Sequence, residues 1–438
     1  MIAIPERPAA PLNPEYQELK FTLHHKLLDR INLEVLAGID DDRIRAEVRD
    51  AVLAIVADEP NLLTGAEKQQ ISDEVLHEVF GLGPLEPLLN DPGISDILVN
   101  GHRQVYVERK GLLELTSVRF HDNAHLLRII DKIVSQVGRR VDESTPMVDA
   151  RLADGSRINA IIPPLAVDGP LLSIRRFGTD KLGPDDLVAR GALTPGMMRL
   201  MQAAVTAKLN VIVSGGTGAG KTTLLNALSV FIGSKERIVT IEDAAELQLK
   251  QPHLARLETR PANLEGHGAV RQRQLLINCL RMLPDRIIVG EVRGEEALDM
   301  LQAMNTGHDG SLTTVHANSP RDAISRLEVM VTLANANMHL TAIRQQIASA
   351  VHILLQCARL SDGTRRVTHI TEVTGIETDI VTLQDIFVFE KRGVSPGGRV
   401  LGRYVATGIL PKFNEKLLAA GIRLPGEMFD ELVEVGGA

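Results

Sequence analysis

The chain has 438 residues, of which 44% are hydrophobic and 24% charged, with a formal net charge of −8. This length is too great for one small core, and the usual domain sizes predict roughly two to four domains. Aromatic residues make up 3% of the chain, with three Tyr and no Trp. The acidic balance and the few aromatic rings argue against a dedicated nucleic-acid binder, so no stable nucleic-acid partner is expected.

The sequence carries no sign of export or of a membrane span. No stretch approaches the ~18 consecutive apolar residues that a spanning helix requires. The first residues, MIAIPERPAAP, have neither a basic start nor an apolar run, so no secretory signal is predicted and we expect a cytoplasmic protein. Cys279 and Cys357 lie in apolar segments, which predicts small buried side chains rather than a disulfide or a zinc site.

Residues 1–80 are predicted to form a helical bundle with a disordered start. The first 14 residues are rich in proline. Between about 14 and 58, apolar residues recur at helical spacing, and a further helix is predicted from Thr64, as its N-cap, to about Phe80.

Residues 81–178 have a different pattern and are predicted to form an α+β domain. Short strands are indicated by ISDILVNG, QVYVER, SRINAIIP and LLSIRRF. The segment HLLRIIDKIVSQVG predicts a helix among them that ends at Gly138. Residues 179–194 contain turn signals and are predicted to be a linker.

Residues 195–438 alternate between strand and helix patterns. The predicted strands are LNVIVSG, RIVTIED, DRIIVGE and SLTTVHA. Almost wholly apolar strands that alternate with helices indicate an α/β fold, with a parallel sheet covered on both faces. From VHILLQCARL onward the pattern favours antiparallel strands, with IVTLQDIFVFE as a long one.

The most specific motif is a phosphate-binding loop between a predicted strand and a predicted helix. Its glycines let backbone N–H groups turn inward around phosphate oxygens, and the helix N-terminus adds partial positive charge. Lys221 is predicted to reach the β- and γ-phosphates, and the Thr222 hydroxyl to bind Mg²⁺. The predicted nucleotide-binding residues here are Gly215, Gly216, Thr217, Gly218, Ala219, Gly220, Lys221, Thr222 and Thr223.

Two predicted strands end in carboxylates that suit ATP hydrolysis. DRIIVGE ends in Glu291, a Walker B arrangement in which Gly290 stands where many NTPases carry Asp. RIVTIEDAAE ends in Glu242 and Asp243, and a carboxylate near the γ-phosphate can orient or deprotonate the attacking water. On spacing alone, Glu242 and Asp243 are equally compatible with surface acids that follow a strand, whereas the Walker B reading is favoured for Glu291.

A histidine-containing segment follows the Walker B strand. Gly307 is predicted to end the helix EEALDMLQAMNT, and SLTTVHA is the next strand. His316 then falls at the carboxyl end of a strand, the usual ligand edge of an open α/β sheet. There a histidine can contact a γ-phosphate by hydrogen bonding, although a structural role is the commoner one.

Together, GGTGAGKTT, TIEDAAEL, RIIVGE and TGHDGSLTTVHANSP resemble, in this order, the ATPases of type II secretion, type IV pili and type IV secretion. Further segments, RLADGSRINAIIPP, LLSIRRF, LETRPAN and IVTLQDIFVFE among them, resemble the branch that powers tight-adherence (Tad) pili, the CpaF-like ATPases. The likeness extends over nearly the whole chain.

The resemblance implies a RecA-like P-loop domain preceded by an α+β, PAS-like domain and the helical bundle. It implies a homohexamer that uses ATP and Mg²⁺ and docks at the inner membrane on pilus platform proteins. It also implies site residues: Glu242 as the water-activating base, Glu291 on the Mg²⁺ side, His308 and His316 in the His box, and Arg157, Arg175 and Arg176 on the nucleotide.

Two positions depart from the Tad pattern. Gln274 replaces an acid and Leu283 an arginine, so a charge pair between subunits at these positions is in doubt. The helix itself is predicted to be sound, because Leu276, Cys279, Leu280 and Leu283 form an apolar stripe.

Two rival functions remain open. A conjugation or DNA-translocating ATPase shares the P-loop and His box, and the acidic charge argues against it. A scaffold that holds ATP without turnover is opposed by the presence of Lys221, Thr222, Glu242 and Glu291 together. The sequence is equally compatible with extension and with retraction of a pilus.

Overall fold

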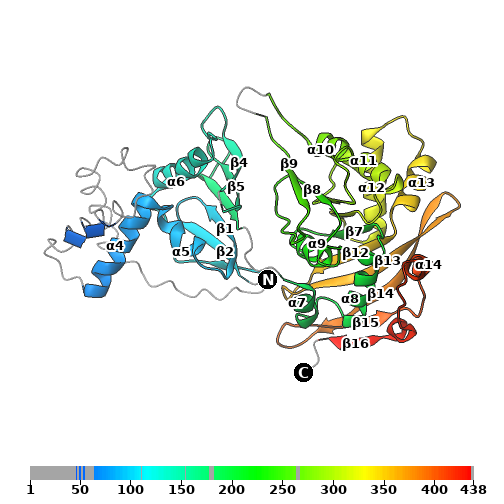
Figure 1. The fold of residues 1–438 in the computed structure, drawn as a ribbon. Coiled ribbons are helices and arrows are strands. Elements are labelled where there is room, and N and C mark those ends of the chain that lie inside the picture. Colours follow the sequence, from blue (N-terminus) through cyan, green and yellow to red (C-terminus); the bar gives the residue numbers. More distant parts are fainter. Residues whose placement is uncertain are drawn as a thin grey trace. The chain divides into compact units, whose positions relative to one another are not determined.

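In a computed structural model (Figure 1), the chain divides into two compact units, residues 1–179 and 180–438. The described residues are 46, 49–50, 53–54, 64–109, 111–152, 154–176, 182–262 and 267–435. The predicted disordered start, and all but the last helix of the predicted bundle, therefore lie largely outside the described residues.

The described part of the first unit is an antiparallel six-stranded sheet in the order β3-β2-β1-β6-β5-β4. Burial alternates along its strands, because one face packs on helix α6 and on the segment before β1. Asp122 caps α6 by accepting a 2.6 Å hydrogen bond from the His125 N–H. The elements are α4 (Gly65–Phe80), η1 (Gly83–Leu85), α5 (Glu86–Leu89), β1 (Ile94–Asn100), β2 (Gln104–Arg109), β3 (Leu112–Leu115), α6 (Asn123–Gln136), β4 (Met147–Arg151), β5 (Arg157–Ile161) and β6 (Leu171–Arg175).

The described part of the second unit is built on a ten-stranded sheet in the order β16-β15-β14-β13-β12-β7-β11-β10-β8-β9. The elements are α7 (Pro184–Ala189), α8 (Pro195–Thr206), β7 (Val211–Gly215), α9 (Lys221–Ser229), β8 (Ile238–Glu242), β9 (Leu254–Glu258), α10 (Gln272–Cys279), β10 (Arg286–Val289), α11 (Glu296–Asn305), β11 (Leu312–Val315), α12 (Pro320–Ala334), α13 (Leu340–Ala350), β12 (Ile353–Arg359), β13 (Arg365–Glu377), β14 (Ile380–Val394), β15 (Val400–Ala406), α14 (Asn414–Ala419), η2 (Gly426–Asp430) and β16 (Leu432–Val435).

The prediction of a parallel sheet covered on both faces, followed by antiparallel strands, is confirmed. Strands β12, β7, β11, β10, β8 and β9 pair in parallel, and β12 to β16 pair antiparallel. Successive residues of β7 point to opposite faces: Val211 and Val213 pack in one core with α8 and α9, and Ile212 packs in the other with α11 to α13. These helices lie on both sides of the sheet in Figure 1.

Two local predictions were wrong. The segment predicted as a linker contains helix α7, and its Leu187 is buried in the core of the second unit. The predicted apolar stripe stops at Cys279, where α10 ends; Leu280 is the C-cap and is 37% exposed, and Leu283 has a φ of 54° and is 86% exposed. Gln274 has a local role, since its side-chain oxygen accepts the Arg271 N–H at 2.8 Å and caps α10.

None of the described helices is both long and apolar enough to cross a lipid bilayer.

Candidate functional site

The predicted site residues of the second unit lie largely along one edge of the parallel sheet. The P-loop follows β7, Glu242 ends β8, Glu291 follows β10, and His316 follows β11. Parallel pairing keeps β7, β11, β10 and β8 in register, so their carboxyl ends meet at the same edge. Open α/β sheets bind ligands at this edge.

The P-loop has a backbone shape that requires glycine at several positions. A Cβ added at Gly215 would lie 2.5 Å from the Cys357 carbonyl oxygen of the neighbouring strand β12. Gly218 and Gly220 have φ values of 70° and 92°, a region that favours glycine. Gly220 is also the N-cap of α9, so the loop leads directly into a helix N-terminus.

Lys221 is folded back onto the loop and is only 8% exposed. Its ammonium group donates to the carbonyl oxygens of Gly215 and Gly216, each at 3.1 Å, and lies 3.3 Å from His316 Nε2. These contacts hold the lysine charge inside the loop, where a β- or γ-phosphate would be bound.

Glu242 is the most strongly perturbed carboxylate of this edge. It is 3% exposed, and burial raises its pKa to about 7 although its Oε2 accepts the Glu246 and Leu247 N–H groups at 2.8 and 2.9 Å. Its Oε1 is buried and has no hydrogen-bond partner among the described residues. One oxygen is thus held by the backbone while the other is available to a water molecule, as a general base requires.

The side chain of Glu242 leaves no room for a Cβ at Gly290. A Cβ at this position would lie 2.8 Å from Glu242 Cγ, because β10 and β8 are neighbouring strands. The Asp that many NTPases carry here would displace the glutamate. The departure noted in the sequence therefore makes room for the buried carboxylate.

Glu291 is held between two cationic or polar neighbours. Its Oε2 accepts from Arg293 at 2.7 Å, and its Oε1 lies 3.0 Å from His316 Nε2. Burial alone would raise the pKa of Glu291, but the hydrogen bond and charge of Arg293, with His316 and Lys221, outweigh it and lower the pKa. Burial, and then the charge of Lys221, lower the pKa of His316, which favours the neutral ring beside the Lys221 ammonium group.

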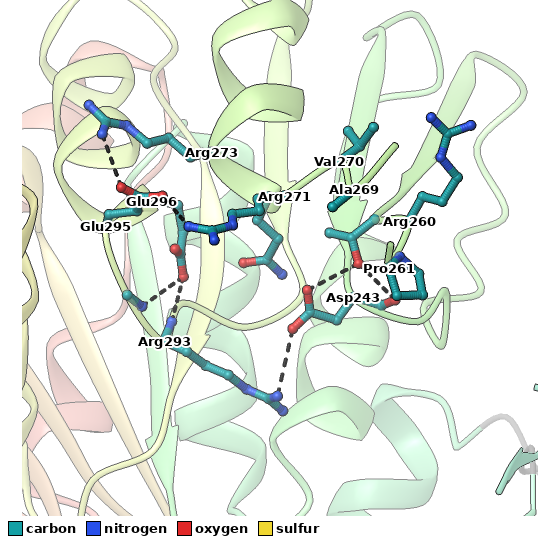
Figure 2. Close-up of a pocket in the computed structure, with 13 residues that line it drawn as sticks. Asp243, Arg260, Pro261, Ala269, Val270, Arg271, Arg273, Arg293, Glu295 and Glu296 are labelled. Carbon is teal, nitrogen blue, oxygen red and sulfur yellow. Dashed lines mark hydrogen bonds and ion pairs between the residues drawn. The ribbon is translucent and has the colours of Figure 1, made fainter. Parts of the chain in front are cut away.

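A cavity of about 620 Å³ lies beside this acidic group. Figure 2 shows Arg293 extending to Asp243, with a 3.6 Å ion pair between them. On another wall Arg273 pairs with Glu295 at 3.2 Å and with Asp299 at 2.8 Å. The charged lining residues are Asp243, Arg260, Arg271, Arg273, Arg293, Glu295 and Glu296. Arg293 therefore links the acidic box to the Walker B acid.

These residues fit a nucleoside triphosphate with Mg²⁺. The glycine-shaped loop, the enclosed Lys221 and the unpartnered Glu242 oxygen are the features such a ligand needs. Among the described residues no three His, Cys, Asp or Glu side chains converge as a metal site. Mg²⁺ in nucleotide sites does not require one, because it is bound through one or two protein oxygens, phosphates and waters.

The structure does not bring every predicted site residue to this edge. His308 precedes β11, whereas His316 follows it, so within this chain His308 lies towards the opposite edge of the sheet. There the side-chain Oδ1 of Asn210, which precedes β7, accepts the N–H groups of Gly310 and Ser311 at 2.8 and 3.0 Å. A role for His308 at an interface stays a prediction.

The three predicted arginines belong to the first unit, and their contact with nucleotide stays a prediction. Arg157 and Arg175 are opposite each other on β5 and β6, and Arg175 pairs with Asp96 at 3.0 Å. Arg176 donates to the backbone carbonyls of Asp91 and Ile94, which gives it a structural role inside the unit.

Sequence reasoning missed three arginines of the second unit that lie at the site. Arg293 stands two positions after the Walker B glutamate, and that spacing at a strand end was the available signal. Arg359 and Arg365 flank the turn LSDGT of a hairpin far along the chain, and only the pairing of β12 with β7 brings them to the P-loop.

Comparison with known proteins places the chain in a family. Residues 78–394 match the family described as Type II/IV secretion system protein. A protein of Mycobacterium tuberculosis (strain ATCC 25618 / H37Rv), provisionally named for conjugal transfer, is 43% identical over 301 residues, covering 67% of this chain and 84% of that protein. The type IV secretion system protein VirB11 of Brucella suis biovar 1 is 32% identical over 322 residues, covering 67% and 89%.

Among solved structures, the VirB11 ATPase of Brucella suis in complex with sulphate matches at 30% identity, covering 66% of this chain and 95% of that chain, with a TM-score of 0.37. The family match covers the P-loop, both acidic strand ends and the His box. The chain therefore belongs to the type II/IV secretion system ATPases and is an ATP hydrolase.

Proposed function

We propose that this chain is the motor of a Tad-type pilus, which hydrolyses ATP to drive pilus assembly or retraction across a bacterial envelope. The observation that carries this proposal is the likeness to Tad ATPases outside the common motifs, in RLADGSRINAIIPP and IVTLQDIFVFE among others. In the structure the first of these segments runs from the last residue of β4 through β5, and the second forms most of β14.

The chemistry proposed for the site assigns one task to each residue. Lys221 and the P-loop backbone bind the β- and γ-phosphates, and Thr222 and Glu291 hold Mg²⁺, partly through water. When bound, the metal supplies charge neutralisation at the phosphates. Glu242 takes the proton of the attacking water through its unpartnered oxygen, and its pKa of about 7 suits a general base at neutral pH.

His316 is proposed to report the state of the γ-phosphate. It lies between Lys221, at 3.3 Å, and Glu291, at 3.0 Å, so a change at the phosphate reaches both residues through one ring. The motor would work as a homohexamer in the cytoplasm, docked on platform proteins at the inner membrane. Hydrolysis around the ring would then move the platform.

A second candidate is a motor for conjugation, which the names of several relatives favour. These include a conjugal transfer protein of Rhizobium radiobacter, 31% identical over 291 residues. The net charge of −8 opposes a role in holding DNA. Binding to duplex DNA at increasing salt separates the two, because affinity that falls steeply with salt indicates contacts to DNA phosphates.

The pilus role is tested by deleting the gene and counting surface pili. We expect pili to be lost, to return with the wild-type gene and to stay absent with Glu242→Gln. Glu377→Gln, an exposed carboxylate at the far end of β13, serves as the matched control and should restore pili. Wild-type numbers of pili in the deletion strain would contradict the proposal.

A further inference from the structure

Strand β7, which carries the P-loop, has different neighbours on its two sides. On one side β11, β10 and β8 present His316, Glu291 and Glu242. On the other side lies the hairpin of β12 and β13. The carboxylates assigned to the attacking water and to Mg²⁺, Glu242 and Glu291, both belong to the first side. The hairpin lies on the side of β7 that carries neither of these groups.

The hairpin places two arginines beside the P-loop. Strand β12 pairs in parallel with β7 up to Cys357, which is opposite Gly215, and then continues past the end of β7 to Arg359. In the hairpin Arg359 is directly opposite Arg365. Two exposed guanidinium groups are thereby brought to one place, since side chains of directly opposed residues lie on the same face of a sheet.

Both arginines reach the glycines of the P-loop. Arg365 Nε donates to the Gly218 carbonyl oxygen at 2.8 Å. A Cβ built at Gly218 would lie 3.6 Å from Arg359 Nη1, and one built at Gly220 would lie 3.3 Å from Arg365 Cδ. The two side chains therefore lie against the loop itself.

The bond from Arg365 also orients the loop. Across a trans peptide the carbonyl and the following N–H point in opposite directions. Holding the Gly218 carbonyl toward the hairpin turns the Ala219 N–H into the loop, where it lies 3.3 Å from the Gly216 carbonyl oxygen.

We propose that Arg359 and Arg365 bind the part of the nucleotide that ATP and ADP share, at its α-phosphate end. A guanidinium group suits this place because it donates in a fork to phosphate oxygens and also stacks on flat rings. This inference rests on nucleotide binding by the P-loop, and it is independent of the pilus role. It makes the hairpin a holder of the leaving ADP rather than a part of the hydrolytic group.

The test measures the Kd of ADP for the full-length protein and the Kd of ATP in a Glu242→Gln background, where turnover is suppressed. The variants are Arg359→Gln, Arg365→Gln and Arg365→Lys. Arg392→Gln is the matched control, because Arg392 is an exposed arginine of β14 in the same sheet, paired at 3.5 Å with Glu434. Circular dichroism and thermal unfolding without nucleotide check that each variant is folded.

We expect each Gln variant to raise both Kd values by the same factor, about tenfold, the scale of one charge-assisted hydrogen bond at an exposed site. Arg365→Lys should recover part of the loss. The kcat at saturating ATP should change by less than about threefold. The lost contacts would bind the ground state and the transition state equally, so their removal raises KM and leaves kcat nearly unchanged. Arg359→Gln gives an independent answer if replacing Arg365 disturbs the loop.

Unchanged Kd values in folded variants would overturn the inference, and so would weakening of ATP alone, because the arginines would then act on the γ-phosphate. Absence of ADP binding in wild type and in Arg392→Gln would overturn the nucleotide assignment of the P-loop as well. Loss of pili without loss of nucleotide affinity would leave the inference contradicted while the pilus proposal stood.

Discussion

The two sides of β7 differ in burial and in charge. The side of β11, β10 and β8 carries a carboxylate that is 3% exposed and a second one held between Arg293 and His316. The hairpin side carries two exposed arginines that lie against Gly218 and Gly220. Groups that react need a dry and fixed environment, whereas groups that only bind can remain in water.

This difference predicts that substitutions on the two sides of β7 have different effects on turnover and on nucleotide affinity. Changes on the acid side should lower kcat and leave nucleotide affinity nearly intact. Changes on the hairpin side should weaken ATP and ADP equally and leave kcat nearly intact.

The largest effect is expected from Glu242→Gln. The amide cannot take a proton from water, so kcat should fall by about 10²-fold or more, the scale of a lost general base. The ADP Kd should stay within about twofold of wild type, because Glu242 lies on the acid side. Steady-state ATPase assays and ADP titrations measure the two quantities, with Glu377→Gln as the control. Normal turnover by Glu242→Gln would move the base to another residue.

Gly290→Ala should have the next largest effect without any change of a charged group. The new Cβ would lie 2.8 Å from Glu242 Cγ and would displace the carboxylate. Misplacement of a catalytic group by about 1 Å can lower the rate by about 10²-fold, so we expect a loss of that order or somewhat less.

The control for Gly290→Ala is Gly393→Ala in β14, where nothing lies within 4 Å of the added Cβ. Its kcat should match that of wild type. A Gly290→Ala protein that is folded and fully active would show that the position of Glu242 is not critical.

Arg293→Gln should reduce activity by about tenfold, as loss of a residue that orients a metal-side ligand usually does. Its 2.7 Å bond to Glu291 is lost, so the pKa of Glu291 should rise and more Mg²⁺ should be needed for half-maximal activity. A Mg²⁺ titration of the ATPase rate measures this. Arg271→Gln is the control, since Arg271 is 79% exposed and its ion pair is a long one of 3.6 Å. An unchanged Mg²⁺ requirement would separate Arg293 from Glu291.

The smallest effect is expected from a modest change of pH. Burial raises the pKa of Glu242 from 4.5 to about 7, so the carboxylate that accepts a proton is present above pH 7 and is lost as the pH falls through 7. The kcat/KM of wild type should therefore fall by about fivefold between pH 7 and pH 6, since this ratio reports the free enzyme. The Kd of ADP should stay nearly constant over the same pH range. An acid limb near pH 4.5 would show that Glu242 is not buried in the working enzyme.

Much of the second unit could be predicted from local pattern. The strands β7, β8, β10 and β11 were each visible as apolar runs, because a strand buried on both faces has apolar residues at nearly every position. The P-loop, Glu242, Glu291 and His316 could be placed at strand ends for the same reason. The pattern could not predict which of these side chains is most buried or most strongly perturbed, because burial and hydrogen-bond partners do not follow from the position of a residue in a strand.

Other features could not be predicted because they depend on residues far apart in the chain. The end of α10 before Leu283 was missed, since an apolar residue at helical spacing looks the same whether it is buried or exposed. The need for glycine at position 290 depends on Glu242, which lies on a neighbouring strand. The place of Arg359 and Arg365 depends on β12 pairing with β7 rather than on any motif.

The sequence by itself therefore determined the chemistry of the loop, the α/β class and the order of the strands along the chain, because these follow from local spacing and apolar pattern. The tertiary structure decided which side of β7 each group occupies, which carboxylate is buried enough to have a pKa of about 7, and which arginines lie on the loop. Those properties come from burial and from the order of strands in the sheet, which arise only when distant segments pack together.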